Sequence, residues 1–273
     1  MKLIVTLLAL LASTNLYAWN QRSPNPIEQC QIHSPYGFPQ IKTQIQPICR
    51  QGYLVGYDAQ AKIPKFVTYE LSPQNALGCI ARSNAFTADQ SIKNGPKPDD
   101  YTGTGYDKGH ASPDGDQSWD QQVEYESFLM TNMFPQHGSL NRGIWKLLET
   151  SIRGWSTQLN NNFTIYVGAV YTDQNKKIGS GVIVPHGFYK IVINNNTKEI
   201  AGWAFPHQPP YPNLGNDLTK YRLPIAQIQQ AAGVTYAFPN GSIEVQPGQE
   251  WKVDFGDLTN SKRKKCGVNS SAD

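Results

Sequence analysis

Residues 139–159 read SLNRGIWKLLETSIRGWSTQL, and this stretch has the most regular pattern in the chain. Its apolar side chains recur at spacings of 3, 4, 3 and 4 residues, at Trp145, Leu148, Ile152, Trp155 and Leu159. Such spacing places side chains on one face of an α-helix. The stretch therefore predicts one long amphipathic helix that packs on the rest of the fold by that face.

Strand candidates lie on both sides of this helix. They are runs rich in β-branched and aromatic residues, at 65–71, 163–171, 181–184, 188–194 and 200–205. Closely spaced strands joined by short turns favour antiparallel pairing. No internal repeat or long low-complexity linker divides the chain. The sequence therefore predicts a single α+β domain with a mainly antiparallel central sheet.

The N-terminus has the pattern of a signal peptide. Residues 1–18 read MKLIVTLLALLASTNLYA, with one lysine, an apolar run at residues 3–12 and a small residue before the expected cleavage point. An uncleaved anchor is the alternative, but the apolar run is short for a bilayer. We therefore expect a signal peptide at 1–18 and a mature domain at 19–273. The mature chain is expected to have no membrane span and to be exported, either to the periplasm or outside the cell.

The four cysteines agree with export, because Cys30, Cys49, Cys79 and Cys266 all follow the expected cleavage point. An even number in an exported chain indicates two disulfides, and the absence of a CxxC pair argues against a zinc site. Four cysteines allow three pairings, which the sequence leaves open. Pairing Cys30 with Cys49 and Cys79 with Cys266 is preferred, because the first bond closes a short loop. Residues 19–50 would then form an irregular arm.

Composition and charge set further limits. With 39% hydrophobic and 16% charged residues, the chain is globular rather than disordered. The formal net charge of +3 permits a polyanionic partner without requiring one. The basic run at residues 262–265 is expected to be a solvated tail rather than a binding patch. Neither a GxSxG nor a GxxxxGK[ST] sequence is present, so the corresponding hydrolase and phosphate-loop chemistries have no support.

Three polar segments carry the candidate chemistry. Residues 106–113 read YDKGHASP, residues 131–136 read TNMFPQ, and residues 140–149 read LNRGIWKLLE. In these segments the chain resembles the DNA/RNA non-specific endonuclease family of ββα-metal nucleases. That family has a DRGH tetrapeptide, an [ST]NxxPQ segment, and LNxGxW with a glutamate eight residues after the asparagine. The tetrapeptide alone is a weak signal, but the ordered set is specific, and the resemblance runs from about Phe66 to Phe205.

The resemblance implies a metal-dependent endonuclease that hydrolyses DNA and RNA without sequence preference and leaves 5′-phosphates. His110 is implied as the general base, a role that suits an imidazole with an ordinary pKa of about 6.5. Asn141 is implied as the direct protein ligand of Mg²⁺, with Mn²⁺ or another divalent ion as the alternative. Glu149 is implied to hold the ion through water. The structural alternatives are a helix-capping role for Asn141 and a simple surface position for Glu149.

Further residues are expected to contact phosphate or to support the site. Arg82 is the best match for an arginine that the family carries before its histidine, and a guanidinium there can clamp phosphate oxygens. Lys108 stands where the family usually has arginine, so the charge is kept but the planar fork is lost. Asn132 and Gln136 are expected to support the site by hydrogen bonding. Asp107 is expected to be structural.

Two other functions remain open at this point. A nucleic-acid-binding protein with vestigial catalysis would be expected to lack His110 or Asn141, yet both are present. A phosphodiesterase for small nucleotides would keep the same catalytic residues. The expected partners are DNA and RNA, contacted through the phosphate backbone, which carries no sequence information. The sequence gives no indication of the oligomeric state.

Overall fold

The computed structural model describes residues 25–267, so the expected signal peptide at 1–18 lies outside the described part of the chain. A seven-stranded sheet forms the centre, in the order β13-β11-β10-β7-β4-β3-β2. Every neighbouring pair is antiparallel except β11 and β13. Its strands are β2 (Gln46–Cys49), β3 (Leu54–Asp58), β4 (Ile63–Leu71), β7 (Phe163–Val170), β10 (Gly187–Asn194), β11 (Glu199–Pro206) and β13 (Ile243–Glu244). The predicted α+β class with a mainly antiparallel sheet is confirmed.

Three two-stranded sheets and several helices complete the fold. The short pairs are β5 (Tyr106–His110) with β6 (Met133–His137), β1 (Gln40–Ile41) with β12 (Val234–Thr235), and β8 (Lys177–Ile178) with β9 (Val182–Ile183). The α-helices are α1 (Pro26–Gln29), α2 (Pro73–Ala76), α3 (Asp114–Gln117), α4 (Gln121–Ser127), α5 (Lys146–Leu159), α6 (Ile225–Ala232) and α7 (Phe255–Cys266). Other helical turns are η1 (Gln31–His33), η2 (Pro98–Tyr101), η3 (Met130–Asn132), η4 (Leu140–Trp145) and η5 (Leu218–Tyr221).

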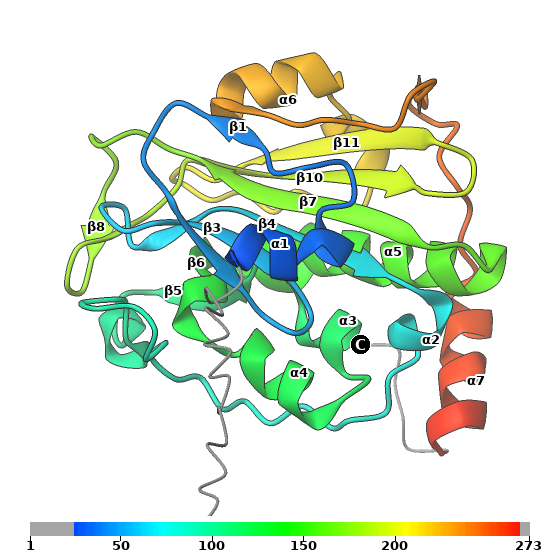
Figure 1. Ribbon diagram of the computed structural model, residues 1–273, viewed down its shortest axis with the longest axis horizontal. Helices are drawn as coiled ribbons and strands as arrows, with labels where there is room; N and C mark the ends of the chain where they lie inside the picture. Colours follow the sequence, from blue (N-terminus) through cyan, green and yellow to red (C-terminus); the bar gives the residue numbers. More distant parts are fainter. Residues whose placement is uncertain (1–24, 268–273) are drawn as a thin grey trace, which may run out of the picture.

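The central sheet is covered on both faces, which is why its strands are apolar throughout. Helix α6 covers one face, whereas α5 and the β5–β6 hairpin lie on the other (Figure 1). Successive residues of a strand point to opposite faces. In β10, Tyr189 and Ile191 pack with Ile228 of α6, and Phe188 and Val192 belong to the core that contains α5. The sheet thus forms a rigid support beneath the hairpin and α5.

The predicted helix at 139–159 is interrupted. Gly143, inside η4, has the non-helical angles φ −104° and ψ −118°, so the stretch is kinked there and the regular helix α5 begins only at Lys146. The inward positions from Trp145 to Trp155 are buried as predicted, but Leu159 is 41% exposed. The helix ends at that residue, because Asn160 adopts a left-handed conformation that turns the chain towards β7. The expectation of a continuous helix, and of Leu159 in its packed face, was therefore wrong.

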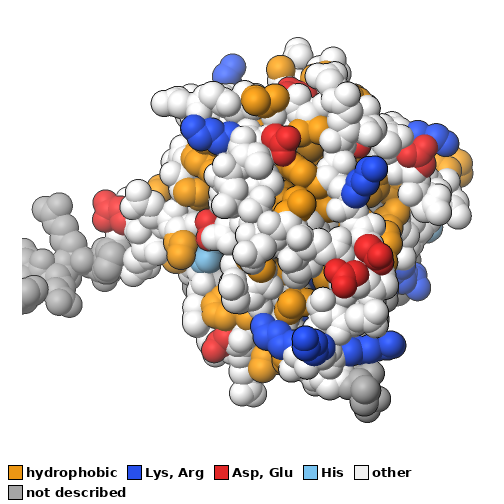
Figure 2. Space-filling model, turned by 90° about the vertical axis from the view of Figure 1, so that its right-hand side faces the viewer, with side chains coloured by type: hydrophobic (Ala, Val, Ile, Leu, Met, Phe, Trp, Pro, Cys, Tyr) orange, Lys and Arg blue, Asp and Glu red, His pale blue; other side chains and the backbone are white. Residues whose placement is uncertain are grey.

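The first and last of the described segments contain more regular structure than the sequence indicated. Cys30 pairs with Cys49 and Cys79 with Cys266, which is the preferred pairing. Residues 25–50 are not simply irregular, since they contribute α1 and the edge strand β2. The basic run at 262–265 is no tail either: it lies in α7, where Lys262 is buried. Figure 2 shows Lys and Arg side chains gathered at the lower edge of the face on which α7 lies.

The segment that precedes β5 has little regular structure. Residues 87–106 form turns and η2, with a single bridge from Thr87 to Leu129 before β5 begins. Among residues 25–267, no helix combines the length and the apolar character that crossing a bilayer requires.

Candidate active site

The hairpin of β5 and β6 sets the position of the catalytic candidates. Lys108 pairs with Pro135, Gly109 with Phe134 and His110 with Met133. A Cβ atom at Gly109 would collide with Oε1 of Gln136. The glycine therefore leaves room for the Gln136 side chain of β6 to lie across β5. The arrangement places His110 at the end of β5.

A polar cavity of about 330 Å³ lies where the hairpin meets η4 and α5. Five of the six predicted site residues line this cavity, namely Arg82, Lys108, His110, Asn141 and Glu149. Segments up to 67 residues apart in sequence therefore meet at one place. Asn132 does not line the cavity. The fold brings together most of the residues that the sequence indicated.

Asn132 lies fully buried behind the cavity. Its Oδ1 accepts a hydrogen bond from the backbone N–H of Ser112 at 2.9 Å, and its Nδ2 donates to the carbonyl oxygens of Ser112 and Ser127, each at 2.8 Å. These bonds fix the backbone two residues after His110. Asn132 therefore holds the strand rather than facing the cavity.

His110 is buried, and two aromatic rings flank its imidazole. Its ring centroid lies 4.9 Å from that of Phe128, edge to face, and 5.6 Å from that of Phe86. Its Nε2 is buried and has no hydrogen-bond partner among the described residues. Burial, followed by the nearby charges of Arg82 and Lys190, lowers the pKa of His110 to about 3. The imidazole is therefore neutral near pH 7 and has a nitrogen free to accept a proton.

Asn141 is oriented by Asp107. Its Nδ2 donates to Asp107 Oδ2 at 3.0 Å, which turns Oδ1 away from that carboxylate. Asp107 also pairs with the exposed Arg142, whose Nε lies 3.0 Å from Asp107 Oδ2. No group of three or more His, Cys, Asp or Glu side chains in the described part of the chain can hold a metal ion. An ion at Asn141 would accordingly take most of its ligands from water and phosphate.

Glu149 lies in the first turn of α5, and its side chain is 12% exposed. Its Oε1 is buried without a hydrogen-bond partner, although Lys190 Nζ lies 3.5 Å away at an ion-pair distance. Burial raises the pKa of Glu149 to about 7, against the opposing effect of Lys190. The Glu149 side chain lines the cavity that also contains Asn141, and a carboxylate there suits a hydrated divalent cation.

Arg82 is held on three sides. Its Nη1 pairs with Asp114 Oδ1, its Nε donates to Asn84 Oδ1 at 2.7 Å, and its guanidinium lies over the Phe128 ring at 4.9 Å. Lys108 Nζ lies 5.2 Å from the centroid of the Phe86 ring. Lysines and arginines outnumber carboxylates along the cavity wall, which is lined by Arg82, Lys108, Arg142, Lys146 and Arg153 against Asp114 and Glu149. The resulting positive potential favours phosphate groups.

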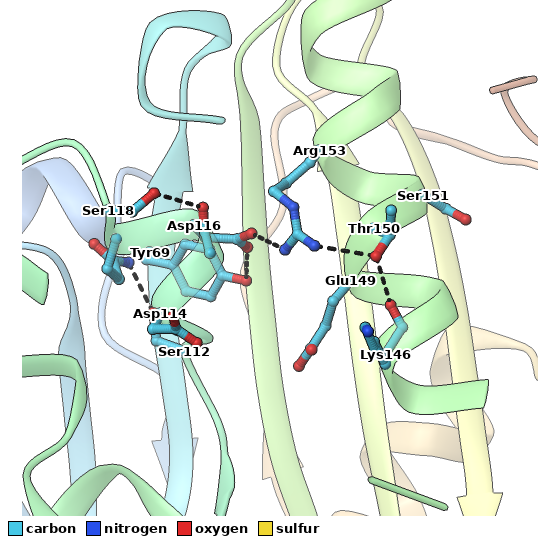
Figure 3. Close-up of polar contacts among 12 residues, drawn as sticks. Tyr69, Ser112, Asp114, Asp116, Ser118, Lys146, Glu149, Thr150, Ser151 and Arg153 are labelled. Carbon is cyan, nitrogen blue, oxygen red and sulfur yellow. Dashed lines mark hydrogen bonds and ion pairs between the residues drawn. The ribbon is translucent and has the colours of Figure 1, made fainter. Parts of the chain in front are cut away.

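Arg153 also lines the cavity, and sequence reasoning did not select it. It is buried on α5, where Nη1 donates to Asp116 Oδ1 at 2.9 Å and Nη2 donates to Thr150 Oγ1 at 3.0 Å (Figure 3). Asp116 in turn accepts a hydrogen bond of 2.7 Å from Tyr69. In the sequence, the position of Arg153 one helical turn after Glu149 was the available signal that it reaches the site, because residues four apart share a helix face.

A strand hairpin, a helix and a basic cavity with a free imidazole define a nuclease of the ββα-metal class. The sequence model of the DNA/RNA non-specific endonuclease family matches residues 33–241. The chain belongs to this family of divalent-metal-dependent hydrolases, and it is a DNA/RNA endonuclease.

Individual relatives agree with this assignment. A nuclease of Nostoc sp. is 29% identical over 217 residues, covering 74% of this chain and 76% of the relative. Mitochondrial endonuclease G of Bos taurus is 26% identical, covering 75% and 72%. The crystal structure of an EndoG/EndoGI complex superimposes with a TM-score of 0.67 at 25% identity, covering 78% of this chain and 92% of the other.

Proposed function

We propose that this protein is an exported endonuclease that uses one divalent ion, Mg²⁺ or a substitute such as Mn²⁺, to hydrolyse DNA and RNA without sequence preference. His110 would act as general base, and the products would carry 5′-phosphates. The observation that carries the proposal is the neutral imidazole of His110, which lines the same cavity as Asn141.

The base step follows from the surroundings of His110. The rings of Phe86 and Phe128 hold the imidazole and exclude water from its flanks. Because the ring is neutral, it can take a proton from an attacking water as the new oxygen–phosphorus bond forms. The cationic side chains of Arg82 and Lys108 then compensate the negative charge that develops on the phosphate.

Asn141 and Glu149 are the residues that would hold the ion, the first directly and the second through water. Asn141 offers a hard amide oxygen whose direction is set by Asp107, and Glu149 offers a carboxylate that lines the same cavity. When bound, the ion supplies positive charge that stabilises the phosphate and the departing 3′ oxygen. Asn132 contributes by fixing the backbone that follows His110.

Substrate range and location belong to the same proposal. The proposed phosphate contacts are cationic side chains, which bind the backbone and read no bases. The two disulfides support export, since such bonds persist in oxidising compartments. We propose a single mature domain at 19–273, preceded by a signal peptide at 1–18.

The test compares the wild type with His110→Ala on double-stranded DNA and on RNA, with Mg²⁺ and with a chelator. The histidine in the turn before β10, His186, does not line the cavity, so His186→Ala is the matched control. We expect His110→Ala to lower the rate by about 10²- to 10⁴-fold. The chelator should abolish cleavage by every variant. Products should be labelled by a polynucleotide kinase only after phosphatase treatment.

Other results would point elsewhere. Intact DNA and RNA after incubation of the wild type with Mg²⁺ would contradict the proposal. Salt-dependent DNA binding without cleavage would favour a binding protein with vestigial catalysis. Faster turnover of dinucleotides than of polymers would favour a small-nucleotide phosphodiesterase.

A further inference from the structure

A fully buried lysine lies beneath the active site. Lys190 is in β10, near the middle of the central sheet, and its side chain has no exposed surface. Its neighbours two positions away, Phe188 and Val192, belong to the core on the α5 side. Because strand residues alternate between faces, Lys190 points to the same side as the catalytic helix. Removing an ammonium from water is costly, so this position calls for a specific reason.

The ammonium of Lys190 contacts both halves of the catalytic motif. Its Nζ donates to the carbonyl oxygen of Ala111 at 3.4 Å, and Ala111 directly follows His110. The same atom lies 3.5 Å from Glu149 Oε1. It also lies 4.4 Å from the centroid of the Trp145 ring, at the start of α5. One charge on the sheet therefore joins the strand that carries His110 to the helix that carries Glu149.

We propose that Lys190 is a positioning residue that holds the Glu149 side chain turned into the cavity and keeps the helix in register with the His110 strand. This inference rests on the proposed function, in which Glu149 serves the ion. Lys190 lies behind the carboxylate and does not line the cavity, so its effect on the reaction passes through Glu149.

A second buried lysine provides the matched control. Lys65 in β4 is 8% exposed, and its Nζ lies over the Tyr171 ring, 4.3 Å from the centroid. It does not line the cavity. Lys65→Met therefore also removes a buried ammonium from the central sheet, and it shows what such a loss does to the fold alone.

The experiment is a double-mutant cycle of Lys190→Met, Glu149→Gln and the combined variant. Urea unfolding in chelator gives the coupling between the two side chains without metal. We expect each single variant to be destabilised by an unpaired buried group, and the combined variant to be less destabilised than the sum of the two. Additive losses would overturn the proposed pairing. This arm does not depend on catalysis, so it stands even if the proposed function fails.

The kinetic arm measures kcat, KM for DNA and the Mg²⁺ concentration at half-maximal rate. We expect Lys190→Met to lower kcat and to raise the Mg²⁺ concentration at half-maximal rate, each by about 10- to 100-fold. KM for DNA should stay close to the wild-type value. In the Glu149→Gln background, Lys190→Met should cause little further change in kcat or in the Mg²⁺ concentration at half-maximal rate. Lys65→Met should retain wild-type kinetics. Wild-type kinetics for Lys190→Met, or an equal loss in both backgrounds, would overturn the proposal.

A further measurement covers the case in which Lys190→Met does not fold. Carbon NMR of labelled lysine in the wild type and in Glu149→Gln should show a shift of the Lys190 side-chain signal and none for Lys65. An unchanged Lys190 signal would show that the ammonium does not sense Glu149, and the proposal would be wrong.

Discussion

The side-chain amide of Asn141 donates to the carboxylate of Asp107 at 3.0 Å, and this bond joins the proposed metal ligand to the hairpin that carries His110. An amide has one donor end and one acceptor end. With the donor end engaged by Asp107, the acceptor end has a defined direction. Asp107, expected from sequence to be structural, thereby sets the direction of the ligand oxygen.

Replacing Asp107 should weaken metal binding more than it weakens the fold. Asp107→Ala frees the amide of Asn141 to rotate, so we expect the affinity for Mn²⁺ or Mg²⁺ to fall by about 10- to 100-fold. The side chain of Asp107 is 29% exposed, so the unfolding temperature should change little. Calorimetric metal titration measures the first effect. Asp173→Ala, in an exposed turn, is the charge-matched control; an unchanged affinity for Asp107→Ala would contradict the orienting role.

Arg82 should matter more than Lys108 for the transition state. Arg82 is pre-oriented by Asp114, Asn84 and the Phe128 ring, whereas Lys108 makes a single aromatic contact. We expect Arg82→Lys, which loses the planar fork, to lower kcat by about 10²-fold. Lys108→Arg should stay near the wild-type rate. Single-turnover cleavage of a short duplex measures both, and a larger loss at Lys108 would reverse the assignment.

Metal affinity should depend on pH through Glu149. Its pKa is raised to about 7, so in the metal-free protein the carboxyl is largely protonated below that pH and ionised above it. Since a cation favours the carboxylate, metal affinity should rise as the pH increases through about 7. Titrations of the nucleic-acid-free protein between pH 5.5 and 8.5, a range of about three units around that value, measure this. Glu149→Gln should remove that slope, and its persistence in the variant would assign the titration to another group.

His207 should make the fold sensitive to acid. Its Nδ1 donates to the Pro185 carbonyl at 2.7 Å, and its Nε2 accepts the backbone N–H of His137 at 2.8 Å. Burial lowers the pKa of His207 to about 4, whereas unfolded histidine titrates near about 6.5. The contribution of neutral His207 to the free energy of unfolding is therefore fully present above pH ~6.5. It is lost as the pH falls towards ~4, and the loss amounts to up to about 3 kcal/mol.

Urea unfolding at several pH values tests this expectation. His207→Gln should be less stable than the wild type at pH 7, because the bonds to Pro185 and His137 are impaired. It should also lose less stability between pH ~6.5 and ~4, since the titrating group is gone. A variant with the full wild-type slope would show that acid acts on other buried histidines, such as His33, whose pKa burial also lowers.

Local patterns in the sequence were sufficient for much of the fold. The period of the helix and the alternation of the strands report burial directly, so the inward positions from Trp145 to Trp155 and the antiparallel sheet were predictable. The break at Gly143 was not, because a glycine inside a helical pattern is compatible with either a continuous or a kinked helix. Leu159 fitted the period but lies at the end of α5, beyond the packed face.

In the candidate site, too, local patterns predicted some residues and missed others. Motif spacing indicated the residues that face the cavity, whereas the groups behind them come from distant segments. Lys190 is 41 residues from Glu149 and 79 from Ala111, so no local pattern could join them. A lysine within the apolar strand Gly187–Asn194 was the available signal, since a charge at an inward strand position requires a partner. Arg153 does not belong to the apolar period of the helix, yet its guanidinium reaches the buried Asp116.

The Cys79–Cys266 bond has a consequence for the order in which the enzyme becomes complete. Cys79 stands three residues before Arg82, and its partner is synthesised 187 residues later, at the end of α7. A ribosome that has finished α5 has already made His110, Asn141 and Glu149, but the segment that carries Arg82, the proposed phosphate contact, still has no covalent anchor. That anchor needs the last helix and an oxidising compartment. In a nascent or reduced chain, Arg82 would thus be held only by its contacts with Asp114, Asn84 and the Phe128 ring.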